Sequence, residues 1–257
     1  MKAFLVRFFC LLLLPLALSA KEVITVARGE GSYPPLEINA DGKLSGLHID
    51  ISLAVAQRIG IQIKYLDLAW GRAIEAVKTG KVDAITYLGY TAERNKFVYF
   101  LPGNVLSSST TVFIVKEDRF KEFSFNGDLR SMQDYVIGVQ HGYSYGEMVD
   151  DASYLHKDSV YTELDVEDML MKHRHDAAIM SYQEFLGFQG QGKLQELTFL
   201  TPPISWEPQY LAFSRNTLKD EKIVEIANRF SQEMLRFRKT DEYRKIVRRY
   251  KYYNYEK

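Results

Sequence analysis

The chain has 257 residues, which is long enough to bury the core of one large domain or of two small ones. Its 33 basic residues balance 33 acidic residues. This balance excludes the strongly basic character of many nucleic-acid-binding chains, so we expect no nucleic-acid partner. The sequence also contains 17 Tyr, 15 Phe and 2 Trp. We expect most of these rings in the core and some in the wall of a cleft.

The N-terminal segment has the pattern of an export signal. Lys2 and Arg7 are followed by an apolar run from Phe8 to Leu18, and small residues come next. The run is too short for a membrane span, which needs about 20 apolar residues. We therefore expect residues 1–20 to be a signal peptide that is cleaved near Lys21. An uncleaved anchor is the alternative.

The residue types and their spacing exclude several classes of site. The single cysteine, Cys10, lies inside the apolar run, so we expect the mature chain to have no disulfide and no cysteine metal site. The five His show no zinc-ligand spacing. No nucleotide-binding, nucleophile-elbow or metalloprotease motif is present. We expect neither a metal nor a cofactor.

Hydrophobic patterning in the first half of the chain predicts alternating strands and helices. Apolar positions four residues apart predict a helix over 47–59, which Gly60 ends. Strands are predicted over 23–27, 61–66 and 82–86. Strand-helix-strand spacing of this kind favours a parallel sheet with helical crossovers. Ligands in such sheets bind beyond the carboxyl ends of the strands.

The second half predicts a similar unit and then a return to the first. Further strands are predicted over 110–115, 136–139, 176–180 and 210–214, and helices end near His173 and cover 222–238 and 243–250. The segment Gly80–Ile85 resembles Arg174–Ile179 in sequence. Each copy places a strand end and a polar loop at one cleft, which indicates two facing lobes.

The stretch from Trp70 to Arg94 combines an aromatic residue with a candidate anion site. Thr91 is typical of a helix N-cap, which predicts a helix there with Arg94 in its first turn. A cation in that position opposes the helix dipole, whereas a bound anion would take backbone N–H groups and the guanidinium together. The alternative is a core Trp, with the Arg paired to a surface residue such as Glu93.

This stretch resembles the amino-acid-type substrate-binding proteins of bacterial ABC transporters, solute-binding protein family 3. The shared pattern is the aromatic Trp70, then Gly80-Lys81-Val82-Asp83, then Thr91-Ala92-Glu93-Arg94. The resemblance extends from about Val23 to Tyr252. It implies an α/β fold of the type II periplasmic binding proteins, with two lobes, a hinge and a central ligand cleft.

The resemblance also implies where the chain passes between the lobes. Two crossings are expected near Ser109–Lys116 and Gln209–Arg215. The first lobe would then comprise residues 21–111 and 214–257, and the second lobe residues 112–213.

In the family, an Arg at the position of Arg94 binds the ligand carboxylate, and aromatic residues at the positions of Trp70 and Tyr33 cover the ligand. Gly89 and Thr91 flank the Arg and could complete the anion site. The second lobe's loop would be Gly142-Tyr143-Ser144, which in the family donates N–H groups to the same carboxylate. Here Tyr143 replaces a small hydroxyl residue.

Two departures from the family pattern concern the ligand. Ser181 stands where members that bind α-amino acids carry an acid for the ligand ammonium, and a hydroxyl supplies no charge. Glu30 or Glu207 could replace that acid, or the ligand has no α-ammonium. In addition, the spacing from Asp83 to Arg94 is one residue shorter than the common pattern.

The resemblance implies an exported, periplasmic, monomeric binding protein that captures a small carboxylate-bearing, amino-acid-like solute for a membrane permease. We expect no enzyme activity. One alternative is a periplasmic dehydratase or lyase on the same fold, for which Glu30, His141 and Glu207 are available without a visible partner. The other is a ligand sensor that docks on a membrane receptor.

Overall fold

The computed structural model describes residues 22–217 and 221–251. The expected signal peptide lies outside the described residues. Within them, no helix is long and apolar enough to cross a membrane.

The strands, in chain order, are β1 (Glu22–Gly29), β2 (Ile38–Ala40), β3 (Lys43–Ser45), β4 (Ile61–Leu68), β5 (Ala84–Gly89), β6 (Val98–Tyr99), β7 (Val105–Lys116), β8 (Val136–Gln140), β9 (His156–Val160), β10 (Ala177–Ser181), β11 (Leu197–Phe199) and β12 (Ser205–Ser214). The α-helices are α1 (Leu47–Arg58), α2 (Trp70–Lys78), α3 (Glu147–Asp150), α4 (Glu163–Met171), α5 (Tyr182–Gly190), α6 (Glu221–Phe237) and α7 (Asp241–Arg249). Short 3₁₀ helices are η1 (Arg94–Lys96), η2 (Pro102–Asn104), η3 (Glu117–Glu122) and η4 (Leu129–Met132).

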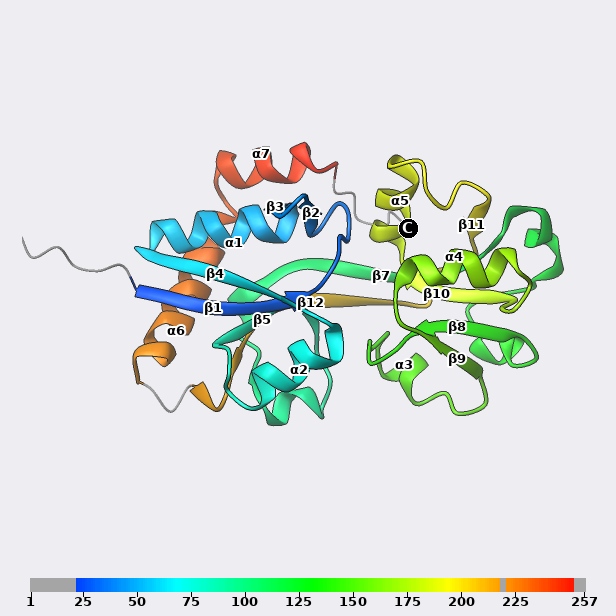
Figure 1. The fold of residues 1–257 in the computed structure, drawn as a ribbon, viewed down its shortest axis with the longest axis horizontal. Helices are drawn as coiled ribbons and strands as arrows, with labels where there is room; N and C mark the ends of the chain where they lie inside the picture. The colour runs from blue at the N-terminus through cyan, green and yellow to red at the C-terminus, as the bar shows by residue number, and fades with distance from the viewer. Residues whose placement is uncertain (1–21, 218–220, 252–257) are drawn as a thin grey trace, which may run out of the picture.

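Two long strands join the halves of the molecule (Figure 1). The main sheet has the order β4-β1-β5-β12-β7-β10-β8-β9. β12 and β7 are antiparallel partners at its centre. On each side of this pair the strands are parallel to one another: β4, β1 and β5 on one side, and β10, β8 and β9 on the other. Because β5 is antiparallel to β12 and β10 is antiparallel to β7, the two parallel sets run in opposite directions and their carboxyl ends face each other.

Each lobe has a hydrophobic cluster on each face of its part of the sheet. Successive side chains along β7 point to opposite faces of the sheet. Val112 and Ile114 pack in one second-lobe cluster, and Phe113 and Val115 pack in the other. Helix α6 contributes to a first-lobe cluster with one stripe of apolar side chains at helical spacing: Ile226, Phe230, Met234 and Phe237. Packing on both sheet faces leaves the strand ends as the place where the lobes can share a site.

Most predicted elements are confirmed, with bounds that differ by a few residues. The helix expected to begin at Thr91 is wrong, because only the three residues of η1 are helical there. The Thr91 hydroxyl still accepts a hydrogen bond from the Arg94 N–H at 3.0 Å. So short a turn has little dipole, and the dipole argument for Arg94 fails. Helix α5 and strand β9 were not predicted.

A buried glycine fixes how α6 packs on the first lobe. A Cβ at Gly103, in η2, would overlap the carbonyl and hydroxyl oxygens of Ser231. We expect Gly103→Ala to lower the free energy of unfolding by about 1–3 kcal/mol, as overpacking does. Gly71→Ala is the control, since nothing lies near its Cβ position, and it should leave stability unchanged or raise it by up to about 1 kcal/mol. Urea unfolding of both variants measures the difference, and equal stabilities would contradict the packing argument.

Candidate functional site

Loops from both lobes meet where the parallel strands end. In the first lobe, Tyr33 follows β1, Trp70 follows β4 and Arg94 follows β5. In the second lobe, Gly142 and Tyr143 follow β8. The structure therefore brings together five of the residues that the sequence predicted for the site.

Arg94 is a buried cation in this cleft, with 8% of its surface exposed. Its Nη1 donates to the Gly89 carbonyl at 3.0 Å, and its Nη2 donates to the Gly142 carbonyl at 3.4 Å. Among the described residues, no carboxylate forms an ion pair with it. Burial lowers the pKa of Arg94 from its ordinary value. Nearby ionisable side chains offset only part of this lowering: Tyr143, Asp150 and Glu93. A buried charge whose direct hydrogen-bond partners are neutral is poorly compensated, which makes this position favourable for a bound anion.

Trp70 reaches across the cleft to the same carbonyl. Its Nε1 donates to the Gly142 oxygen at 3.0 Å. Gly142 has φ +72°, a left-handed conformation that glycine adopts without strain. The sequence predicted that this loop would offer N–H groups to a carboxylate. In the structure the carbonyl of Gly142 points at the donors of the first lobe.

Four aromatic rings close the inner part of the cleft. Tyr143 lies with its ring centre 6.2 Å from that of Trp70 and 6.2 Å from that of Tyr87. Tyr33 packs edge-on to Tyr87 at 6.4 Å, and its hydroxyl donates to the Glu30 carbonyl at 2.8 Å. The hollow between these rings has a volume of about 10 Å³, which holds roughly one water molecule.

A larger hollow of about 510 Å³ is lined by Arg94. Its walls come from α2 and the Thr91–Phe97 segment in the first lobe, and from Gly142–Ser144 and α3 in the second. Five carboxylates line it against one Lys and the Arg: Glu75, Glu93, Glu147, Asp150, Asp151, Lys78 and Arg94. The mouth of the cleft is therefore predominantly acidic.

The remaining predicted residues lie around this centre. Ser181 is buried at the end of β10, beside Thr111 of β7. Its hydroxyl donates to Gln183 Oε1 at 3.2 Å, and it lines neither hollow. Glu30 is exposed and also lines neither hollow. The Ser144 hydroxyl donates to Asp150 and so helps to hold the loop. Glu207 lies beside Gly146. Burial raises the pKa of Glu207, and the charges of Glu147 and Asp150 raise it further.

The sequence model of the bacterial extracellular solute-binding proteins, family 3, matches residues 25–252. This match covers most of the chain. The chain belongs to that family.

Two curated relatives and one solved structure show the likeness in more detail. A probable histidine-binding protein of Campylobacter jejuni is 24% identical over 203 residues, 77% of this chain and 74% of the relative. An L-arginine-binding protein of Pseudomonas aeruginosa is 30% identical over 115 residues, 44% of this chain and 42% of the relative. A histidine kinase sensor domain with similarity to periplasmic binding proteins has a TM-score of 0.77 at 20% identity, covering 90% of this chain and 96% of that chain. The predicted two-lobed type II fold is confirmed.

Sequence reasoning missed a buried ionic network beneath this cleft. Glu37, which lines the inner hollow, accepts from Arg28 Nε at 3.0 Å and from the Thr86 hydroxyl at 2.9 Å. Its other near neighbour is His48 Nδ1, at 3.3 Å, and His48 Nε2 lies 2.7 Å from the hydroxyl of Ser107 on β7. The network links the cleft floor to a strand that runs between the lobes. Its members come from five separate segments, so no local pattern in the sequence marks it.

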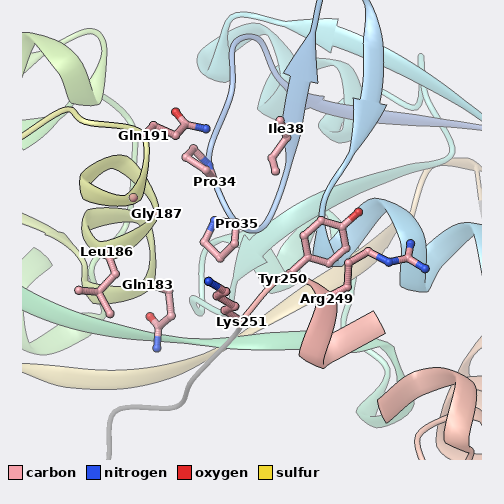
Figure 2. Close-up of a pocket in the computed structure, with 11 residues that line it drawn as sticks. Pro34, Pro35, Ile38, Gln183, Leu186, Gly187, Gln191, Arg249, Tyr250 and Lys251 are labelled. Atoms are coloured by element: carbon pink, nitrogen blue, oxygen red, sulfur yellow. The ribbon is translucent and has the colours of Figure 1, made fainter. Parts of the chain in front are cut away.

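A third hollow is shown in Figure 2. It has a volume of about 420 Å³ and lies between the Pro34-Pro35 loop, α5 and the end of α7. Here the lobes touch closely, because a Cβ at Gly187 would overlap the carbonyl of Pro34. This hollow contains none of the predicted ligand-binding residues.

The charge of Glu37 gives a test of the network. Burial alone raises the pKa of Glu37, but hydrogen bonds and charge from His48 and then Arg28 outweigh it, so the pKa lies below its ordinary value. A carboxylate with a lowered folded-state pKa stabilises the fold at neutral pH and loses that contribution as pH falls through the folded-state value. We expect Glu37→Gln to remove about 3–5 kcal/mol at pH 7, because Arg28 loses its buried partner and keeps only the partly exposed Asp67, and less in acid.

Urea unfolding of wild type and variant across this pH range measures the effect. Glu30→Gln is the matched control, since its side chain is exposed and should change stability by no more than about 0.5 kcal/mol. A Glu37→Gln variant as stable as wild type at pH 7 would show that the network is dispensable.

Proposed function

We propose that this protein is an exported solute-binding protein that captures a small carboxylate-bearing, amino-acid-like solute. The observation that carries the proposal is the buried guanidinium of Arg94, whose partners in the structure are the carbonyl oxygens of Gly89 and Gly142. A carboxylate gives such a group a charged and bidentate partner. Trp70 shares the Gly142 carbonyl with Arg94, and we assign Trp70 and Tyr33 as the covering rings. Thr91 holds the backbone of Arg94 in place.

The acidic mouth favours an amino acid with a positive side chain. Two relatives are named for histidine and L-arginine, and both names fit this reading. Ser181 supplies no charge for an α-ammonium. We assign this role to Glu207, because it lies beside the second-lobe loop at Gly146. Glu30 stays a prediction. A thermal-shift panel of amino acids and of carboxylates without the ammonium tests this assignment.

We propose that the lobes divide within β7 and β12, close to the boundaries expected after residues 111 and 213. Leu106 and Leu211 pack in a first-lobe cluster, whereas Phe113 and Ile204 pack in a second-lobe cluster. Bending of the two strands between these positions would open and close the cleft around Arg94. The loaded, closed form would then dock as a monomer on a membrane permease in the periplasm.

The two alternatives differ from this proposal in different ways. A receptor-docking sensor would use the same cleft and differ only in its membrane partner, so co-purification from the native membrane decides between them. A dehydratase or lyase would need a paired acid and base. Steady turnover of cyclic carboxylic acids that scales with protein concentration would establish it.

Replacement of Arg94 tests the proposed carboxylate site. We expect Arg94→Ala to weaken binding of the best ligand from the panel by about 2–5 kcal/mol, since it removes one partner of a desolvated charge pair. This loss is roughly 30-fold to several thousand-fold in affinity. Arg94→Lys should recover part of it, because a point charge lacks the planar fork. Calorimetry measures all three proteins.

Arg72→Ala is the matched control, because Arg72 is an exposed cation on α2 of the same lobe and should bind as wild type does. If Arg94→Ala also binds as wild type, the anion site lies elsewhere. If it instead unfolds the protein without added ligand, Arg94 has a structural role.

Export is tested by the mature N-terminus. We expect the protein from its native host to begin near Lys21 and to appear in the periplasmic fraction, because the apolar run is shorter than a membrane span. Intact-mass measurement of fractionated cells shows the cleavage site. Retention of Met1 on a membrane-bound product would support the anchor alternative.

A further inference from the structure

The loop after β8 is held in one shape by its own contacts. The backbone N–H of Tyr143 donates to the Gln140 carbonyl at 3.2 Å. The Gln140 N–H donates to the Tyr145 hydroxyl at 2.8 Å, and the Tyr145 N–H donates to Asp150 at 3.0 Å. These bonds fix the direction in which the loop presents its next groups to the first lobe.

The Gly142 carbonyl occupies the position of an anion between two first-lobe donors. It accepts from Trp70 Nε1 at 3.0 Å and from Arg94 Nη2 at 3.4 Å. A ligand carboxylate that bound Arg94 through both guanidinium nitrogens would compete for the second of these bonds. The left-handed φ of +72° at Gly142 is what turns this carbonyl toward the cleft.

Tyr143 occupies the space beside these donors. Its ring lies 6.2 Å from Trp70, 6.2 Å from Tyr87 and 4.9 Å from Tyr145, between ring centres. The hollow that Trp70, Tyr87 and Tyr143 help to line has about 10 Å³ of free volume, enough for roughly one water molecule. No amino acid enters this inner cleft unless the Tyr143 ring moves.

We propose that Gly142 and Tyr143 are a built-in occupant of the inner cleft, which closes the lobes on each other. Arg94 also lines the larger hollow, and a ligand that takes both of its guanidinium nitrogens and reaches the inner rings must displace this occupant. The inference rests on the proposed function, because it takes Arg94 as the carboxylate ligand. The occupant weakens ligand binding by reducing the fraction of molecules that can bind. If nine in ten molecules are closed in this way at rest, only one in ten can bind ligand, and the apparent affinity is about tenfold weaker than that of a fully open population. Tyr143 then sets how much binding free energy a solute must supply before it is captured.

The test uses Trp70 as a reporter without any ligand. The chain has two Trp residues, and Trp206 is 57% exposed on β12, so Trp206→Phe leaves Trp70 as the only indole. In this background we expect Tyr143→Ala to shift Trp70 emission to the red, to increase its quenching by acrylamide and to increase the radius of gyration in small-angle scattering. Tyr161→Ala is the matched control, because Tyr161 is a tyrosine of the same lobe that is 83% exposed.

Binding kinetics then show whether the ligand displaces Tyr143 or only contacts it. With L-arginine and L-histidine as probes, removal of the occupant should speed association, by about tenfold if nine in ten molecules are closed at rest, whereas loss of an ordinary contact changes mainly the dissociation rate. Tyr143→Ser is a second variant if Tyr143→Ala is poorly folded. An unchanged Trp70 signal in both variants overturns the inference, even if the wild type binds its ligand.

The two proposals fail separately. Opening of the cleft by Tyr143→Ala without any carboxylate binding would support the built-in occupant and contradict the proposed function. Normal carboxylate binding through Arg94, with an unchanged Trp70 signal in Tyr143→Ala, would do the reverse.

Discussion

The charge of Arg94 is the constraint on which the cleft depends. A guanidinium keeps its charge at any physiological pH, and this one is nine-tenths buried where two lobes meet. Its neutral carbonyl partners satisfy donors without compensating the charge. The first lobe supplies one of these partners through Gly89, and the second supplies the other through Gly142. The same cation can therefore hold the lobes together through a backbone carbonyl or, as we propose, through a ligand carboxylate.

The rest of the fold places that charge and supports it. Two sets of parallel strands point their carboxyl ends at each other because both are joined to the antiparallel pair β7 and β12. Under the cleft, Arg28 and Glu37 form a second ionic group whose charges are paired, and His48 Nδ1 lies 3.3 Å from Glu37. His48 in turn contacts β7 through Ser107. The two charged sites differ in one respect that matters for function. Arg28 has a carboxylate partner in Glu37, whereas Arg94 has none in the part of the chain that the structure describes.

Much of the fold could be predicted from local pattern. The helix over 47–59 and the strands near 23–27 and 61–66 have strong periodicity, and the structure forms them as α1, β1 and β4. Where the pattern is short, prediction fails. Thr91 has the chemistry of a cap, but only a single 3₁₀ turn follows it, because capping preference alone does not determine helix length.

The site was harder to predict for a physical reason. Trp70, Arg94 and Tyr143 were found through the family pattern, and they lie together. Which way a loop turns its peptide groups is decided by contacts made far along the chain, so the carbonyl of Gly142 facing Trp70 was not foreseen. Glu37 was missed for the same reason, since its partner Thr86 lies 49 residues away. Buried polar networks of this kind follow from the tertiary structure and carry no periodicity.

The central claim is that the cleft recognises a carboxylate through a buried cation. The most direct measurement keeps the protein unchanged and alters the ligand alone, by comparing calorimetric binding of L-arginine with L-argininamide and of L-histidine with L-histidinamide. Each amide keeps the side chain and the α-ammonium and loses only the negative charge. If the buried cation recognises the carboxylate, the amide of the acid that binds should bind more weakly than that acid by about 2–5 kcal/mol, the range for a desolvated charge pair. Equal affinity of acid and amide would contradict it.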